Sequence, residues 1–183
     1  MRTSQTHPLR IAEVRAEPGF GRIGITFCPG KQDLLASTGA WSRDLELDLD
    51  AIQRWGASVI LTLVEPEELR MLKVPHLGDA IQQRGIHWCH LPIADFSTPT
   101  ERFEQQWLAT GPLIRQRLRA GEDVLVHCKG GLGRAGMMAA RLLVELGVEP
   151  EEAIHRVRRA RKGAIETPSQ LALVRKTHTQ TDG

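Results

Sequence analysis

Short apolar runs alternate with helical patterns along this chain, and that alternation limits the possible folds more than any other feature of the sequence. Residues 59–64 and 124–127 are rich in valine, isoleucine and leucine, which is typical of strands buried on both faces of a sheet. Helical patterns precede and follow both runs. Strands that alternate with helices indicate a central, mostly parallel sheet flanked by helices, so the predicted fold class is α/β.

The start and stop signals of the individual elements support this fold. Glycine ends several helical patterns, and Thr98 is predicted to cap a helix that begins at Pro99. The predicted strands are residues 23–27, 59–64, 86–90 and 124–127. The predicted helices are residues 48–55, 76–84, 98–119, 134–146, 150–161 and 168–178, with a further helical turn from Pro66.

A chain of 183 residues is expected to form one domain. Residues 1–21 show no clear periodicity and are predicted to be an N-terminal arm with a short strand near residues 11–15. Residues 22–178 are the predicted single domain, and residues 179–183 are a predicted flexible tail.

Composition excludes several classes of function. The formal net charge is +2, too small to imply nucleic-acid binding, and no apolar run approaches the ~18 residues of a membrane span. The N-terminus lacks the apolar stretch of a secretory signal, so we expect a cytoplasmic protein in a reducing compartment. Three cysteines cannot form a closed set of disulfides, so at least one thiol is predicted to be free.

The segment that carries chemistry is residues 126–136, VHCKGGLGRAG, between a predicted strand and a predicted helix. A glycine-rich turn there aims backbone N–H groups at one point, and the helix N-terminus adds its positive dipole end. Such a turn suits a phosphate, and the same field favours the thiolate of a cysteine at its base. Arg134 follows Cys128 by six residues, so its guanidinium can clamp two oxygens of the same anion.

The spacing of cysteine and arginine is weak evidence by itself. His127 before the cysteine, the glycines of the loop and the strand–loop–helix context make the pattern specific. It is not an ATP-binding loop of the Walker type, because no Gly-Lys-Ser/Thr ends it. The alternative interpretation is a tight turn around an inert buried cysteine.

Asp95 is the candidate acid, because it is the only carboxylate in the loop that follows the strand at residues 86–90. Parallel neighbouring strands place their carboxyl ends at the same edge of a sheet, where ligands bind. One acid there can protonate a leaving oxygen and then accept a proton from the hydrolytic water. The alternative is a local turn in which the Asp95 side chain bonds the backbone before the next helix.

Several stretches of the sequence together resemble a known family. They are residues 73–77 (KVPHL), 92–95 (PIAD) with 98–99, 127–134, and 163–165 (GAI) with Thr167 and Gln170. They resemble the cysteine-dependent protein phosphatases, whose signature is His-Cys-x5-Arg. The resemblance is greatest to the kinase-associated phosphatases, also called cyclin-dependent kinase inhibitor 3-like proteins, a dual-specificity branch.

The resemblance implies a fold of the protein tyrosine phosphatase type and a role for each site residue. Cys128 would be the nucleophile that forms a phosphocysteine, and Asp95 would be the general acid and then the base. Arg134 would hold the phosphoryl oxygens together with the backbone of the phosphate loop, which is Lys129, Gly130, Gly131, Leu132 and Gly133. His127 would support the loop. The family uses no metal or cofactor, and it hydrolyses phosphotyrosine or phosphoserine and phosphothreonine in proteins and peptides.

One departure from the family pattern is Ala135, where relatives usually carry serine or threonine after the signature arginine. That hydroxyl supports the sulfur as it leaves, so we expect slower turnover here. The alternative is a phospho-ligand binding module with weak catalysis, and this alternative stays open.

Three weaker signals also stay open. Lys129 either favours a polyanionic substrate, such as an anionic lipid or a small phosphate, or is an exposed charge at the rim. Gln170 either positions the hydrolytic water or completes a capping box with Thr167. The basic run at residues 156–162 is either a docking surface for acidic partners or a solvated helix face.

Overall fold

The computed structural model describes residues 1–36 and 39–183, and its centre is a five-stranded sheet. The strands are β1 (Ala12–Val14), β2 (Ile23–Thr26), β5 (Ala57–Thr62), β6 (His87–His90) and β7 (Asp123–His127), in the spatial order β1-β2-β7-β5-β6. Strands β2, β7, β5 and β6 run parallel, and β1 lies antiparallel to β2 at one edge. The predicted α/β class is therefore confirmed.

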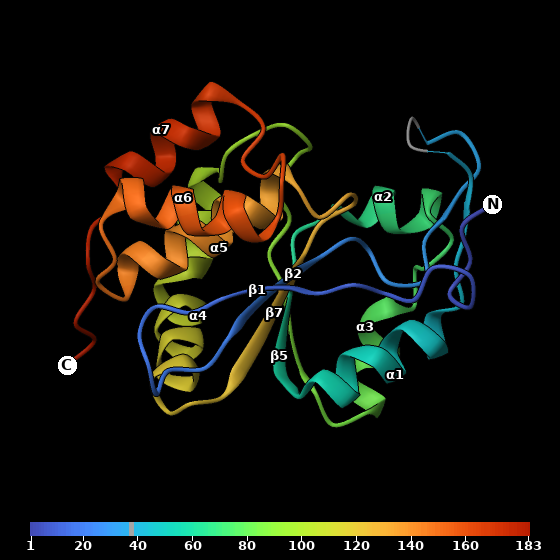
Figure 1. The fold of residues 1–183 in the computed structure, drawn as a ribbon, viewed down its shortest axis with the longest axis horizontal. Helices are drawn as coiled ribbons and strands as arrows, with labels where there is room; N and C mark the ends of the chain where they lie inside the picture. Colours follow the sequence, from blue (N-terminus) through green and yellow to red (C-terminus); the bar gives the residue numbers. More distant parts are fainter. Residues whose placement is uncertain (37–38) are drawn as a thin grey trace.

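Helices cover both faces of this sheet (Figure 1). Helices α1 (Leu45–Trp55) and α3 (Leu77–Gln83) pack on one face, with α2 (Pro66–Met71) beside them. Helices α4 (Glu101–Arg119) and α5 (Gly133–Glu145) pack on the other face, and α6 (Pro150–Ala160) and α7 (Pro168–Lys176) lie outside α5. Helix α5 is buried along its whole length because the sheet and these two outer helices surround it.

The predicted start of α4 is wrong by two residues. Thr100, and not Thr98, is the N-cap, because the Thr100 hydroxyl accepts the backbone N–H of Phe103. Both residues are threonine and either can cap a helix, so the residue type alone does not distinguish them. The loop after β6 is consequently two residues longer than the sequence suggested.

The structure adds a two-stranded sheet that no sequence pattern indicated. Its strands are β3 (Gln32–Asp33) and β4 (Trp41–Ser42), each too short to show alternation. The predicted short strand in the N-terminal segment is present as β1. Arg43 links this segment to the sheet region, because it donates to the carbonyl oxygens of Thr3 and His7.

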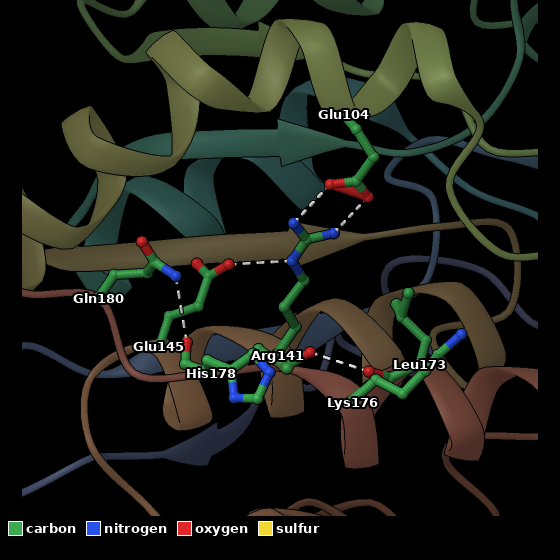
Figure 2. Close-up of a pocket in the computed structure, with 8 residues that line it drawn as sticks. Glu104, Arg141, Glu145, Leu173, Lys176, His178 and Gln180 are labelled. Atoms are coloured by element: carbon green, nitrogen blue, oxygen red, sulfur yellow. Dashed lines mark hydrogen bonds and ion pairs between the residues drawn. The ribbon is translucent and has the colours of Figure 1, made fainter.

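A network of buried charges lies at the far end of α5, around a small cavity of about 240 Å³ (Figure 2). Arg141 binds Glu104 with two hydrogen bonds and also donates to Glu145. Arg115 joins Glu145 to Asp182, a residue of the C-terminal five. Within the described part of the chain, no helix combines the length and apolar character that crossing a membrane requires.

Candidate active site

Cys128 follows β7 at the carboxyl edge of the parallel sheet, where it begins the loop that leads into α5. The last residue of β7, His127, lies level with Thr26 of β2 on one side and Thr62 of β5 on the other. Side chains that follow three parallel strands therefore meet at this edge. Cys128 is buried and carries a free thiol.

The backbone of the loop is arranged to bind an anion. Among the described residues, no N–H group from residues 129 to 135 donates to another protein atom, so these donors are available to a ligand. Gly131 has a φ of +73°, and a Cβ at this position would lie 2.6 Å from the Thr26 carbonyl carbon. Only glycine fits this turn, and the turn together with the N-terminus of α5 forms the predicted cradle.

Arg134 is held in place by contacts from two other elements. Its Nη1 and Nη2 atoms donate to the Glu68 carboxylate at 2.7 and 2.9 Å, and Nη1 also donates to the Ile93 carbonyl at 2.9 Å. The Nε–H is buried and, among the described residues, has no partner in the protein. A buried donor without a partner is costly, so this edge of the guanidinium is suited to an anionic ligand.

Glu68 and Arg134 stabilise each other's charged forms. Burial would raise the pKa of the Glu68 carboxyl, but the hydrogen bonds from Arg134 and from the Glu65 N–H, together with the positive charges of Arg134 and Lys129, hold this pKa below its ordinary value. Burial likewise opposes the charge of Arg134, whereas the Glu68 carboxylate raises the pKa of the guanidinium. Glu68 was not predicted to belong to the site, because an acid in the first turn of a helix is explained by the helix dipole alone.

His127 ends β7 directly before the loop, and its role in supporting the loop stays a prediction. Its ring is fully buried, with Nε2 2.7 Å from the Thr62 hydroxyl and Nδ1 3.2 Å from the Cys128 carbonyl oxygen. Burial lowers the pKa of His127 to about 4, so the imidazole is neutral at pH 7. The ring therefore orders the backbone and does not contribute a positive charge.

Asp95, the candidate acid, lies on the loop after β6 with its carboxylate beside Arg134. Its Oδ1 atom is 3.3 Å from Nη2 of Arg134, and the side chain is 44% exposed. The same oxygen accepts the backbone N–H of Phe96, so the local turn considered as the alternative is partly present. Phe96 has a φ of +60°, which costs a non-glycine residue about 1 kcal/mol or more and occurs often at functional loops.

Neither of the other two cysteines is placed to act as a nucleophile. Burial raises the pKa of the Cys28 thiol, which is fully buried. Burial also raises the pKa of Cys89 to about 11. Both thiols are therefore protonated and unreactive at pH 7, which leaves Cys128 as the candidate nucleophile.

Gln170 forms the capping box of α7 and also bridges to the acid loop. Its Oε1 atom accepts the N–H groups of Glu166 and Thr167, and its Nε2 atom donates to the Ser97 carbonyl oxygen. The amide thus joins α7 to the loop that carries Asp95. The water-positioning role stays a prediction.

The basic run at residues 156–162, which begins in the second half of α6 and ends just after it, makes several contacts inside the molecule. Arg161 donates to the carbonyl oxygens of Gly130 and Gly131, and so braces the outer side of the phosphate loop. Arg158 donates to the carbonyl oxygens of Ala164 and Ile165. Neither contact has a local signature in the sequence, so both were missed.

Cys128 and Asp95 line a cavity of about 940 Å³ that is far larger than one phosphate. It is lined by the phosphate loop, by the acid loop and by the N-terminal segment, which contributes Arg2, His7 and Arg10. Sequence analysis placed none of the N-terminal residues in the site. The cavity has the size of a pocket that holds a whole small molecule.

The α/β fold, the phosphate loop and Asp95 together define a class of phosphatase, and comparisons with known proteins agree with this class. Residues 39–148 match the family model described as "Tc-R-P: Polymorphic toxin system, DSP-PTPase phosphatase". The chain belongs to the family of cysteine-dependent dual-specificity and tyrosine phosphatases.

Within this class the chain is similar to cyclin-dependent kinase inhibitor 3 from Homo sapiens. The two are 35% identical over 136 residues, which cover 70% of this chain and 60% of the human protein. The match thus spans less than two thirds of that relative's length.

Solved structures show the same relationship. A crystal structure of kinase associated phosphatase, with its catalytic cysteine substituted by serine, matches with a TM-score of 0.78 and 29% identity over 91% of this chain and 92% of that chain. The structure of Tk-PTP in the active form matches with a TM-score of 0.66 and 31% identity over 89% of this chain and 93% of that chain. The predicted phosphatase fold is therefore confirmed.

Proposed function

We propose that this chain hydrolyses phosphomonoesters through a phosphocysteine at Cys128, with phosphorylated proteins or peptides as its substrate class. One observation carries the proposal. The N–H groups of residues 129–135 and the Nε–H of Arg134, none of which has a partner among the described residues, belong to the turn between β7 and α5 that begins at Cys128. Such an array stabilises the charge of a phosphoryl group during transfer.

The reaction has two steps, and both use the same residues. The Cys128 thiolate attacks phosphorus, the bond to the leaving oxygen breaks, and the Asp95 carboxyl donates its proton to that oxygen. Water then attacks the phosphocysteine, and the Asp95 carboxylate accepts the proton. The phosphorus–sulfur bond breaks, which releases inorganic phosphate and regenerates the thiolate. Arg134 and the loop hold the phosphoryl oxygens throughout, and Glu68 keeps the guanidinium in position.

Turnover of aryl phosphates by the purified chain, in the presence of a chelator, tests this proposal. The Asp95→Asn variant is expected to lose about a hundredfold in kcat/KM on phenyl phosphate, because general acid catalysis is typically worth 10²–10⁴-fold. The loss is expected to be much smaller on 4-nitrophenyl phosphate, whose leaving group needs no proton.

The exposed Asp79 of α3 offers a matched control. Asp79→Asn should change neither rate. A uniform loss across leaving groups in Asp95→Asn would show that Asp95 is only a turn residue, and no turnover in the unaltered chain would remove the enzyme proposal altogether.

The absence of a hydroxyl group at Ala135 favours weak turnover. Ala135 is fully buried directly after Arg134 and offers no hydroxyl to the Cys128 sulfur. A hydrogen bond to a charged group is worth about 1.5–3 kcal/mol, so Ala135→Ser is expected to speed phosphocysteine breakdown by roughly tenfold or more. Rapid-quench kinetics measures this step as the rate that follows the burst.

Ala139, one turn further along α5, is also fully buried and provides the matched control. Ala139→Ser adds the same hydroxyl away from the sulfur and should not accelerate turnover. If Ala135→Ser changes neither the burst nor the steady-state rate, the missing hydroxyl does not limit this chain.

A further inference from the structure

Lys31 is a buried cation on the wall of the same cavity as Cys128. The residue is 4% exposed, and its Nζ atom donates to the Lys129 carbonyl oxygen at 3.2 Å. The ammonium also lies 4.3 Å from the centroid of the Trp41 ring and 5.0 Å from that of Phe27. Among the described residues, no carboxylate lies within 4 Å of it.

A buried lysine without an acidic partner is uncommon, because burial penalises its charged form. Burial lowers the pKa of Lys31 to about 8, although Cys28, Asp33 and Cys128 favour the charge and Lys129 opposes it. The Lys31 side chain is therefore mostly in its charged ammonium form at pH 7. An ammonium has three donors and the Lys129 carbonyl uses one, so capacity remains for an anion.

Positively charged side chains outnumber carboxylates around the cavity. Its cations are Arg2, Arg10, Lys31, Arg43, Lys129 and Arg161, and its carboxylates are Asp33, Asp95 and Glu166. Arg43 is neutralised by two hydrogen bonds to the buried Asp48, and Lys129 lies 3.5 Å from Asp33.

Arg2 adds a second cation beside Lys31. Its guanidinium lies 5.0 Å from the Trp41 ring, and among the described residues it has no carboxylate within 4 Å. Arg2 and Lys31 thus share the Trp41 ring, and the Lys129 side chain, which pairs with Asp33, leaves the phosphate loop on the wall of the same cavity.

We propose that Lys31, with Arg2 and Lys129, forms a second anion subsite, which binds another phosphoryl group of a compact substrate while Cys128 attacks the first. The inference rests on the proposed phosphocysteine chemistry at Cys128, and for the preferred substrate it replaces phosphorylated proteins or peptides with a compact bisphosphate. The chemistry that fits is a small ring with two phosphoryl groups, such as an inositol bisphosphate, either free or as the headgroup of a lipid.

A compact substrate fits this subsite better than a doubly phosphorylated peptide does. Lys31 is recessed, and it bonds the residue that directly follows Cys128, so the two anion sites share one cavity wall. Two phosphorylated side chains of a peptide diverge from an extended backbone that lies across the mouth of the cavity. The second phosphate would then lie at the rim and not against Lys31.

The test compares kcat/KM for a phosphatidylinositol bisphosphate and for 4-nitrophenyl phosphate, in the unaltered chain and in Lys31→Met. Methionine keeps the apolar stem against Phe27 and Trp41 but removes the charge. The bisphosphate is expected to lose about ten- to a hundredfold, the usual cost of one charge-assisted hydrogen bond, and several-fold more than the aryl phosphate loses. Lys162→Met, which removes an exposed lysine outside the cavity, should leave both rates unchanged.

Two further comparisons show whether the lipid or its headgroup is recognised, and they keep the test informative if Lys31→Met does not fold. The lipid in phosphatidylcholine vesicles is compared with the soluble inositol bisphosphate, which separates lipid recognition from headgroup recognition. Arg2→Gln provides a second variant, with a smaller loss in the same direction. The preference for the bisphosphate is expected to fall as the pH rises through about 8, because the Lys31 ammonium then loses its proton.

Each outcome decides one proposal. An equal loss on both substrates in Lys31→Met would mean that Lys31 only braces the loop through the Lys129 carbonyl, and no loss would also overturn the subsite. A preference for a doubly phosphorylated peptide over both inositol substrates would contradict the compact ligand. If the unaltered chain does not hydrolyse 4-nitrophenyl phosphate, the proposed function itself fails.

Discussion

The Cys128→Ser variant is expected to lose at least about 10⁴-fold in kcat on every phosphomonoester. Loss of a covalent nucleophile is the largest single effect known for such enzymes, and a serine hydroxyl is far harder to ionise than a thiol. Binding should survive, because the loop N–H groups and Arg134 do not depend on the sulfur. Steady-state turnover of 4-nitrophenyl phosphate and calorimetric titration with inorganic phosphate measure the two properties separately.

Cys89 provides the control for this substitution. It is also buried and free, but it lies on β6 with its pKa raised to about 11 by burial. Cys89→Ser should keep nearly full kcat per folded molecule. Residual turnover in Cys128→Ser above about one per cent would show that another group attacks phosphorus.

The second large effect is expected for Glu68→Gln, which should lose about 10²–10³-fold in kcat/KM. Glutamine keeps the size of glutamate but offers one acceptor atom and no charge to the two Nη groups of Arg134. The guanidinium is then drawn towards Asp95, 3.3 Å away, and no longer faces the loop. Losing one preorganised donor of this kind typically costs 10²–10³-fold.

Glu67, the preceding residue of α2, is the matched control. Its side chain is exposed and, in the part of the chain that the structure describes, pairs with Arg70 alone, so Glu67→Gln should leave kcat/KM unchanged. Equal kinetics for the two variants would mean that the loop alone positions Arg134. Glu68→Asp, which keeps the charge, should recover part of the activity if the account is right.

The fold was largely predictable because its strands are buried on both faces and its helices carry local signals. Val59, Ile60 and Leu61 are fully buried, and such a run has few alternatives to a central strand. Gly56 ends α1 in the left-handed conformation, as its position after residues 48–55 indicated. The two-residue strands β3 and β4 were not predictable, because pairing over so short a length leaves no periodicity.

The site was predictable where its residues are close in sequence. Cys128 and Arg134 share one loop, and Asp95 follows a neighbouring strand, so spacing and sheet topology together pointed to them. Glu68 lies 66 positions before Arg134, and Lys31 lies 98 before Lys129. Contacts of this range depend on how α2 and the segment after β2 pack, and no local pattern encodes them.

The central claim is that the phosphoryl group passes through the Cys128 sulfur, and rapid acid quench during turnover tests it most directly. The unaltered chain is mixed with 4-nitrophenyl phosphate, quenched within the burst, digested and mapped by mass spectrometry. The account predicts one phosphorylated peptide, modified at Cys128, that forms during the burst and disappears as substrate is exhausted. Sustained turnover without a phosphorylated peptide, or with the phosphate on another residue, would contradict it.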